Sequence, residues 1–551
     1  MADIRTGVSR RSLIAGGAAA AAAALLPRVP ARAQGPARWR RYNVASSEGQ
    51  RMLGYYQTAI AAMLKLPPED PRNWYRLAFT HYLDCPHGNW WLFPWHRAFT
   101  GWAEQIVRKY SGFDGFAFPY WDWTANPRVP DAFYSQPLLN PSNDAFINQL
   151  DTFQRRFKPA LAATDYWSPN SVRYQQLKIR GIGSNDILWD QLTDPQNENY
   201  PVFFPVQGYP NTRNPNPALD CVASNAVSQR ILTPAMAPQD YMTFSSPEAD
   251  QHSQMVGFAL LEGQPHNKVH NNTGGIVYQS QGTYCNLYAP PSNTGGFMQA
   301  FLSPTDPLFW LHHSNIDRLW EAWSQKTAPA NRLPPAGDPY NKWAREPFLF
   351  FTNADGTPVT QVQAGNYATI GAFNYDYQPG GSVGETLPQG RALRASSRPP
   401  VRRFDGEIPP QGGRLLGTGS VGATAVRLQP ALLQLARPGA AQQLLAKVTL
   451  ALPHAARGQV FQVLIHAGDP ASSVEAGTVA LFGHTMVHGL LTFTVPLGAA
   501  MATLRSRNAL KTNGFLYFRA TDPGSGAHHG PAASASGGEE IRVHSVIVEA
   551  H

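Results

Sequence analysis

The chain of 551 residues is poor in cysteine and in charged side chains. Its three cysteines are too few for the disulfide framework of a small secreted domain. Charged residues make up only 15% of the chain and hydrophobic residues 43%, which excludes disorder of the whole chain. The length favours two or three domains, and 14 tryptophans with 48 prolines and 47 glycines indicate loop-rich domains with aromatic cores.

Long apolar runs are absent except at the N-terminus. Residues 1–33 contain the twin-arginine motif Ser9-Arg10-Arg11-Ser12-Leu13-Ile14, an alanine-rich stretch up to Leu26 and the cleavage site Ala31-Arg32-Ala33. The alternative is a membrane anchor, but the apolar stretch is shorter than the roughly 20 residues of a span. We therefore predict a signal peptide for twin-arginine export of a folded, periplasmic or secreted protein that has no stable membrane span.

The net charge also bears on possible partners. The formal charge is +8, but residues 1–33 hold five arginines and one aspartate, so the remaining chain carries about +4. A charge this small argues against nucleic acid as a partner.

Composition divides the rest of the chain into two parts and a linker. Residues 34–377 are rich in aromatic residues, asparagine and proline, and show helical patterns. Residues 378–414, with Gly-Gly and Pro-Pro pairs, are interpreted as a linker. Residues 415–551 alternate short apolar runs with turn signals, which predicts an antiparallel β-sandwich. The expected helices are 48–64, 71–84, 95–110, 251–270 and 306–324, and the expected strands are 446–452, 460–466, 490–495, 515–520 and 541–548.

Histidines gather in two places within the first part. Two of them are four residues apart, so a helix would place both imidazoles on one face, where one metal ion can take both nitrogens. Histidine sets without a carboxylate favour copper or zinc over magnesium, calcium or manganese. The sets are His81, His87 and His96, and His266 and His270 with one member of the pair His312-His313, which the spacing alone does not choose between.

Longer motifs surround these histidines. They are Phe93-Pro94-Trp95-His96-Arg97, the run of residues 306–320 (DPLFWLHHSNIDRLW), Pro119-Tyr120-Trp121-Asp122-Trp123, and Tyr375-Asp376-Tyr377. In these motifs the chain resembles the type-3 dicopper family of tyrosinases or polyphenol oxidases, catechol oxidases and molluscan hemocyanins. The resemblance implies a mainly α catalytic domain in 34–377, with a four-helix bundle and long loops around a dicopper centre. It also implies that the β-sandwich of 415–551 shields the site and keeps the enzyme latent.

The resemblance also implies roles for individual residues. The second member of the histidine pair, His313, would be a ligand, and His312 would lie just behind the metal. Asp317, one helical turn after His313, would orient a ligand imidazole; the alternative is an ion pair with Arg318 or a neighbour. The implied copper A ligands are His81, His87 and His96, and the implied copper B ligands are His266, His270 and His313.

The cysteines divide into one near the site and two elsewhere. Cys85 stands two residues before His87, and in the family such a cysteine carries a thioether bond to the imidazole; the alternative is a free buried thiol. Cys221 and Cys285 could form one disulfide in an oxidising compartment, but the sequence does not show whether they come within bridging distance.

The implied chemistry is oxidation of o-diphenols to o-quinones with O₂ as co-substrate, and hydroxylation of monophenols. Because a phenol must lose its proton to bind copper, a positioned base is useful. Glu262 and Asn267 resemble the family's water-holding pair; the alternatives are a solvated carboxylate and a plain backbone hydrogen bond. Residues 297–301 would frame the entrance over copper B. Alternative functions are a catechol oxidase only, or a hemocyanin-like O₂-binding protein; the partners would be small phenols and O₂.

Overall fold

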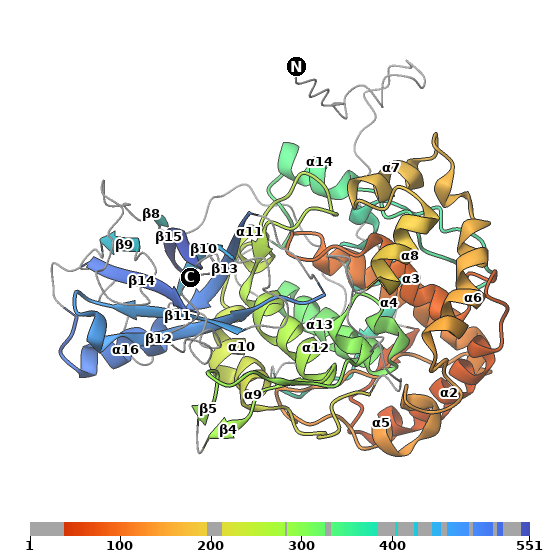
Figure 1. Ribbon diagram of the computed structural model, residues 1–551, viewed down its shortest axis with the longest axis horizontal. Coiled ribbons are helices and arrows are strands. Elements are labelled where there is room, and N and C mark those ends of the chain that lie inside the picture. The colour runs from red at the N-terminus through yellow and green to blue at the C-terminus, as the bar shows by residue number, and fades with distance from the viewer. Residues whose placement is uncertain are drawn as a thin grey trace.

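The computed structural model describes residues 38–194, 212–281, 284–325, 332–382, 403–405, 424–427, 443–452, 460–483, 489–510, 515–521 and 541–551. The predicted signal peptide and most of the predicted linker lie outside these residues. Within them, no helix has the length and hydrophobicity needed to cross a membrane. A helical part and a β-rich part lie side by side (Figure 1).

Four of the five predicted helices are confirmed. α2 begins after Ser46, whose hydroxyl accepts from the Gly49 N–H, and α3 begins after Asn73, whose side chain accepts from the Tyr75 N–H. Side-chain caps of this kind satisfy donors that have no partner within the helix. The helices are α2 (Ser47–Leu64), α3 (Trp74–Asp84), α4 (Leu92–Ser111) and α13 (Leu308–Ser324).

The fifth predicted helix, 251–270, is wrong in its first half. The helical segment begins with η3 (Glu262–His266), a π-helical turn, and continues as α12 (Asn267–Thr273). Instead, β2 (Gly257–Phe258) is a strand that pairs with β13 (Leu490–Pro496) of the β-rich part. A side chain at Gly257 would lie 2.2 Å from the Thr492 carbonyl oxygen, so the close pairing requires glycine.

Shorter elements complete the helical part, whose core is one cluster of buried hydrophobic residues that is rich in aromatic rings. The helices are α5 (Ala132–Ser135), α6 (Leu150–Ala162), α7 (Val172–Ile179), α8 (Asn185–Thr193), α9 (Cys221–Ala226), α10 (Gln229–Ala235), α11 (Tyr241–Phe244) and α14 (Asp338–Arg345). The 3₁₀ turns are η1 (Pro137–Leu139), η2 (Asp165–Trp167), η4 (Phe297–Gln299), η5 (Ser303–Thr305), η6 (Ala364–Tyr367) and η7 (Ile370–Ala372). Two-stranded pairs are β1 (Trp39–Arg41) with β7 (Tyr375–Tyr377), β3 (Ile276–Val277) with β6 (Ser292–Asn293), and β4 (Ser280–Gln281) with β5 (Tyr284–Cys285).

The β-rich part contains two sheets with antiparallel pairing. One has the order β2-β13-β10-β15-β8 and the other β12-β11-β14-β9; only β2 joins in parallel. Apolar side chains of both sheets, such as Val448 and Phe493 from one and Phe461 and Phe518 from the other, share one hydrophobic core. The elements are β8 (Arg403–Asp405), β9 (Thr424–Arg427), β10 (Leu444–Ala451), β11 (Val460–His466), η8 (Pro470–Ser472), β12 (Val474–Ala480), β13 (Leu490–Pro496), α16 (Gly498–Ser506), β14 (Phe515–Thr521) and β15 (Arg542–Ala550).

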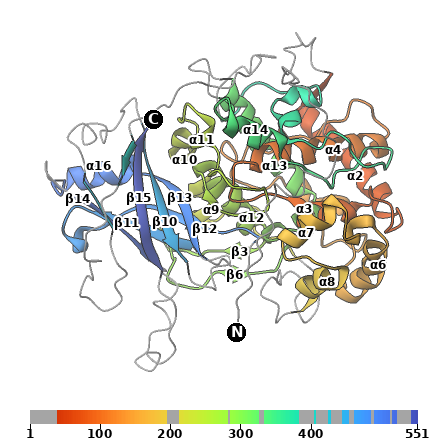
Figure 2. The ribbon, with the colours of Figure 1, turned by 90° about the horizontal axis from the view of Figure 1, so that it is seen from above.

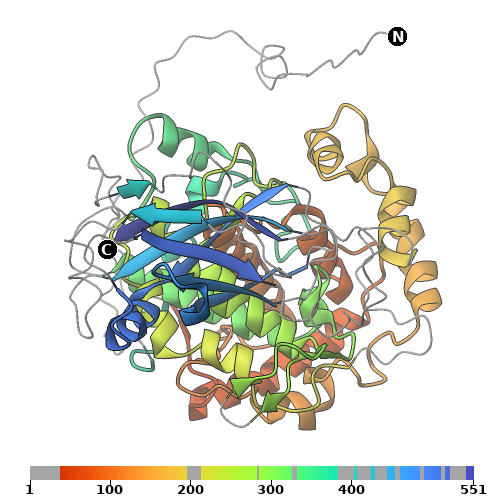
Figure 3. The same ribbon diagram turned by 60° about the vertical axis from the view of Figure 1, so that its left-hand side comes forward.

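All five predicted strands are present, with ends shifted by at most two residues. Strand β12 is an addition that the sequence pattern does not predict, since Gly477 interrupts its short apolar run. It lies at the edge of its sheet and next to the helical part. Figure 2 shows β12 beside α9 and α12, and Figure 3 shows the strands lying across the helices.

Candidate metal centre

All six predicted ligands are buried and converge on one site between α3, α4, α12 and α13. Local structure explains how the first set is presented. His81 lies in α3, which ends before Cys85-Pro86, and His87 follows in a turn whose next residue, Gly88, has φ +66°. A side chain at Gly88 would also lie 2.5 Å from Met255, so glycine is required at this turn. His96 lies in the first half of α4.

In this first set, backbone carbonyls fix the imidazole tautomers. The Nδ1–H of His81 donates to the Phe301 carbonyl at 2.7 Å and that of His96 to the Leu92 carbonyl at 2.8 Å. A carbonyl only accepts, so each Nε2 keeps its lone pair for a metal ion. These two Nε2 atoms are 3.3 Å apart. Two nitrogens bound at 2.0–2.1 Å to one ion at a tetrahedral angle lie about 3.3 Å apart, so the spacing fits a metal ion.

The second set repeats this arrangement. The Nδ1–H of His270 donates to the Met298 carbonyl at 2.7 Å, and its Nε2 lies 3.1 Å from the Nε2 of His313. The Nδ1–H of His266 donates to Asn267 Oδ1 at 2.9 Å. Among the described residues, the buried Nε2 of His266 has no hydrogen-bond partner, which is the state expected of a metal ligand.

The two sets face each other. The rings of His96 and His313 stack with centroids 4.3 Å apart and 7° between their planes, and the rings of His87 and His266 are 5.5 Å apart. Burial lowers the pKa of His81 to about 3 and that of His266 to about 4, so both imidazoles are neutral at neutral pH. Neutral nitrogen donors in two adjoining sets fit a pair of copper ions.

His312 also belongs to this cluster. The nitrogens of His266, His270, His312 and His313 can all lie within 4.8 Å of one another. His313, however, is the member that reaches both His270 and the ring of His96. Neither nitrogen of His312 has a hydrogen-bond partner among the described residues.

The bonds found for Asp317 differ from the predicted contact with a ligand imidazole. Its Oδ1 accepts from Arg97 Nε at 2.6 Å, and Arg97 directly follows His96. Burial alone would raise the pKa of Asp317, but its arginine neighbours lower it below the usual value. The carboxylate thus ties α13, which carries His313, to α4. Its Oδ2 accepts from Arg41, Tyr375 and Tyr377.

The two polar residues predicted to hold a water lie next to the ligands. Glu262 Oε1 accepts from the Gly88 N–H at 2.7 Å, directly after His87, and Oε2 accepts from the Ser246 hydroxyl. Burial raises the pKa of Glu262 to about 8. Asn267 accepts from His266, and its Nδ2 donates to the Ala480 carbonyl of β12 at 3.0 Å. Both side chains therefore connect elements of the site.

The cysteines lie in two separate places. The Sγ of Cys85 is 3.5 Å from Nδ1 of His87. Burial raises the pKa of this thiol. The possible disulfide between Cys221 and Cys285 is confirmed, with Cα atoms 5.6 Å apart. It joins α9 to β5.

Two aromatic residues complete the site. Phe301, in the segment predicted to frame the entrance, stacks on His87 at 5.3 Å, so this segment meets the first set as well as the second. Phe482, the second residue after the end of β12, was not among the predicted site residues. Its ring lies 4.0 Å from that of His270 and 5.2 Å from that of His87. The next residue, Gly483, has φ +70°, and a side chain there would lie 2.5 Å from Phe301.

Comparison with known proteins bears on this site. The family model described as the common central domain of tyrosinase matches residues 68–326. The chloroplastic polyphenol oxidase of Spinacia oleracea is 26% identical over 333 residues, covering 57% of this chain and 43% of that protein. Tyrosinase HcTyr1 of Hahella sp. (strain CCB-MM4) is 24% identical over 383 residues, covering 62% of this chain and 64% of that protein. The match thus spans less than two thirds of these curated relatives.

Solved structures share the fold over both parts of the chain. Latent apple tyrosinase aligns with a TM-score of 0.53 and 17% identity, covering 94% of this chain and 98% of that one. Recombinant latent aurone synthase, a polyphenol oxidase, aligns with a TM-score of 0.53 and 17% identity, covering 94% and 90%. Two facing sets of buried histidines on a helical scaffold suit a dinuclear metal centre. Residues 68–326 of the chain belong to the type-3 copper tyrosinase and polyphenol oxidase family.

Proposed function

We propose that this chain is a copper-dependent phenol oxidase that uses O₂ to oxidise o-diphenols to o-quinones and to hydroxylate monophenols. The observation that carries the proposal is the stacking of His96 on His313, which brings two buried histidine sets together. When bound, the copper pair would supply the redox chemistry with O₂. The protein supplies six buried imidazoles, from His81, His87, His96, His266, His270 and His313.

Monophenol hydroxylation would depend on Glu262 and Asn267. A phenol has a pKa near 10, so its proton must be taken up as it binds. Burial raises the pKa of Glu262 to about 8, so the carboxyl group is mostly protonated at pH 7; once ionised at higher pH, its carboxylate is basic enough to take the phenol proton through a held water. Asn267 would fix the imidazole of His266 through the bond between them. His312 would pack behind the ligands without binding metal.

Cys85 and His87 would be joined by a thioether bond. Their separation of 3.5 Å between Sγ and Nδ1 supports this proposal, since it places the sulfur within reach of the imidazole ring. Forming the bond removes two hydrogen atoms, with O₂ as the oxidant. Peptide mass spectrometry tests it, because the linked peptide lacks the mass of those hydrogens.

The β-rich part would act as a shielding sandwich that keeps the enzyme latent. Phe482 occupies the space against His87, His266 and His270, where a substrate ring would have to lie. Removal of this part from the site, for example after cleavage in residues 378–414, would then admit phenols. Export by the twin-arginine pathway remains a prediction, and it would deliver the folded protein to an oxidising compartment, which suits the Cys221–Cys285 disulfide.

The test is incubation of copper-loaded protein with L-tyrosine and with L-DOPA, before and after limited proteolysis. We expect pigment from both substrates and more of it after proteolysis. Oxidation of L-DOPA but not L-tyrosine would leave a catechol oxidase. Reversible O₂ binding without oxidation of any phenol would favour the hemocyanin-like alternative and overturn the proposal.

A further inference from the structure

Four polar side chains form a row on one face of the helical segment that carries His266 and His270. Two of them are adjacent in sequence, and the others lie three or four positions from these two, as residues on one helix face do. All four are buried where the helical part meets β12. We call this set the donor row; it consists of Gln264, Asn267, Lys268 and Asn271.

Every side chain of the donor row donates to a backbone carbonyl within residues 478–481, at the end of β12. Gln264 and Lys268 both donate to the Thr478 carbonyl, the latter at 3.0 Å. The other two bonds run from Asn267 to the Ala480 carbonyl at 3.0 Å and from Asn271 to the Leu481 carbonyl at 2.8 Å. Because β12 is an edge strand, its outer side presents carbonyls that its own sheet leaves open.

The polypeptide that the donor row binds leads directly into Phe482, whose ring lies against the histidines. After the carbonyls of residues 478, 480 and 481 comes Phe482, with its ring against His270. The donor row therefore holds a stretch of polypeptide by its backbone and directs the aromatic side chain that follows into the site. Lys268 also donates to the Thr478 hydroxyl oxygen at 2.6 Å, but the other bonds to this segment are to main-chain carbonyls, which every residue type offers, so the contacts place few demands on sequence.

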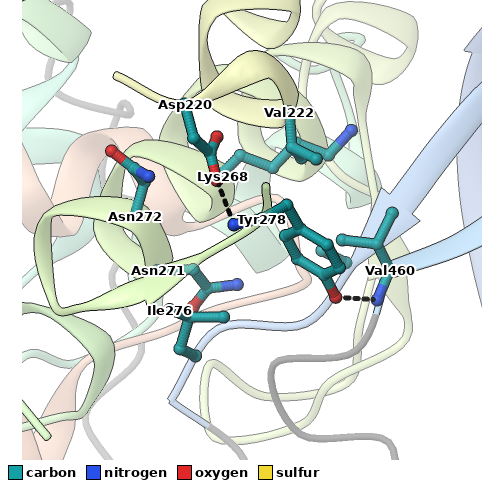
Figure 4. Close-up of a pocket in the computed structure, with 9 residues that line it drawn as sticks. Asp220, Val222, Lys268, Asn271, Asn272, Ile276, Tyr278 and Val460 are labelled. Carbon is teal, nitrogen blue, oxygen red and sulfur yellow. Dashed lines mark hydrogen bonds between the residues drawn. The ribbon is translucent and has the colours of Figure 1, made fainter. Parts of the chain in front are cut away.

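A residue beside the donor row, Tyr278, offers a hydrogen-bond acceptor. The hydroxyl of Tyr278 accepts from the Val460 N–H at 3.1 Å, and the Tyr278 N–H donates to Asp220 at 2.7 Å (Figure 4). Lys268 and Asn271 of the donor row line the same small cavity as Tyr278. A surface with donors for carbonyls and an acceptor for an N–H is suited to peptide backbone.

We infer that the donor row is a binding site for polypeptide, and that the enzyme's substrates include phenolic side chains within an extended chain. The inference rests on the proposed phenol oxidase function. Phe482 and the residues before it occupy the site in the way that such a substrate would, once the β-rich part has moved away. Two o-diphenol side chains are oxidised to o-quinones for each O₂, and their four electrons and four protons reduce the O₂ to two water molecules, so no further reactant is needed.

The contacts predict the chain direction in which a peptide substrate binds. The backbone that the donor row binds precedes the Phe482 ring in sequence. In a peptide substrate, residues on the N-terminal side of the phenol should therefore improve binding, and residues on its C-terminal side should not. Two peptide amides of the same composition test this, with 3,4-dihydroxyphenylalanine placed last after Thr-Val-Ala-Leu, or first before Leu-Ala-Val-Thr. The copper-loaded chain is activated by limited proteolysis with both fragments retained.

We expect kcat/KM to be about tenfold higher for the peptide with the phenol last. The double variant Gln264→Ala/Asn271→Ala should bring the ratio of the two values close to one. Asn366→Ala, which removes an exposed amide in η6, is the matched control and should leave the ratio unchanged. Equal values for the two peptides in the unsubstituted protein, or a ratio that the double variant does not alter, would overturn the inference.

Calorimetry with phenylalanine in place of the catechol gives a readout that does not depend on turnover. The peptide with the ring last should bind about tenfold more tightly than its reversed counterpart. Equal affinities would contradict the inference even if free L-DOPA is oxidised. If free L-DOPA is not oxidised, the proposed function fails, whereas a directional binding preference would still identify a peptide site.

Discussion

The imidazole of His270 and the phenyl ring of Phe482 stack with centroids 4.0 Å apart and 30° between their planes. One residue belongs to the helix that carries the second histidine set, and the other to the β-rich part more than 200 positions later. Such stacked pairs contribute about 0.5–1.5 kcal/mol beyond the burial of their surfaces. The histidine site is therefore covered by Phe482 when the β-rich part packs against the helical part.

Replacing Phe482 by alanine should activate the intact chain. The side chain fills the space against the histidines, so its removal opens a path for small o-diphenols without displacing the β-rich part. We expect oxygen uptake with L-DOPA to rise by about tenfold or more relative to the unsubstituted, copper-loaded chain. Phe515→Ala, which removes a partly exposed ring of β14, serves as the control. An unchanged rate for Phe482→Ala would show that the ring is not the barrier.

The adjacent histidines should differ in copper binding. His313 reaches both His270 and His96, whereas His312 reaches only the second set. His313→Ala should abolish occupancy of one of the two sites. His312→Ala should retain both ions and weaken binding, within the roughly 10- to 100-fold range of residues behind metal ligands. Metal analysis after dialysis against a weak chelator measures both, and the reverse ranking would contradict the assignment.

Loss of the Cys221–Cys285 disulfide should destabilise the chain. The bond closes a loop over a sequence separation of 64. Constraint of the unfolded chain by a loop of this size contributes about 2–4 kcal/mol. Urea unfolding of Cys221→Ser/Cys285→Ser should therefore show a free energy of unfolding lower by about that amount. Equal stability of the variant and the parent chain under oxidising conditions would contradict this expectation.

His252 should make stability depend on pH. Burial would lower its pKa, but Asp84 and Glu346, at 2.9 and 2.8 Å from its two nitrogens, raise it above the usual value. A raised pKa stabilises the folded chain fully below the unfolded value of about 6.5, and this contribution is lost as pH rises through the folded value. His252→Gln should thus cost more stability at pH 6 than at pH 9 by urea unfolding. A cost independent of pH would show that His252 is not charged.

Short-range patterns predicted the parts of the site that lie on single helices. The spacing of His266 and His270 fixes both on one face of a helix, and the motif around His313 lies within one buried helix. Contacts between distant residues could not be predicted in this way. Asp317 binds Arg97 and Arg41, which are remote in sequence, so its partners depend on how α4, α13 and β1 pack.

The junction with the β-rich part was also beyond the sequence patterns. No recognisable sequence motif surrounds Phe482, and Gly477 interrupts the apolar run that forms β12. The helix predicted from residue 251 begins only at Glu262, because residues 257–258 pair with β13. In each case tertiary packing decides the structure where the local pattern is weak.

Turnover of L-DOPA by the activated chain at measured copper content tests the proposed function most directly. We predict that oxygen uptake rises with copper content up to about two ions per chain. His313→Ala, loaded in the same way, should show little or no uptake. Reversible O₂ binding without quinone formation, or equal rates with and without copper, would contradict a copper-dependent phenol oxidase.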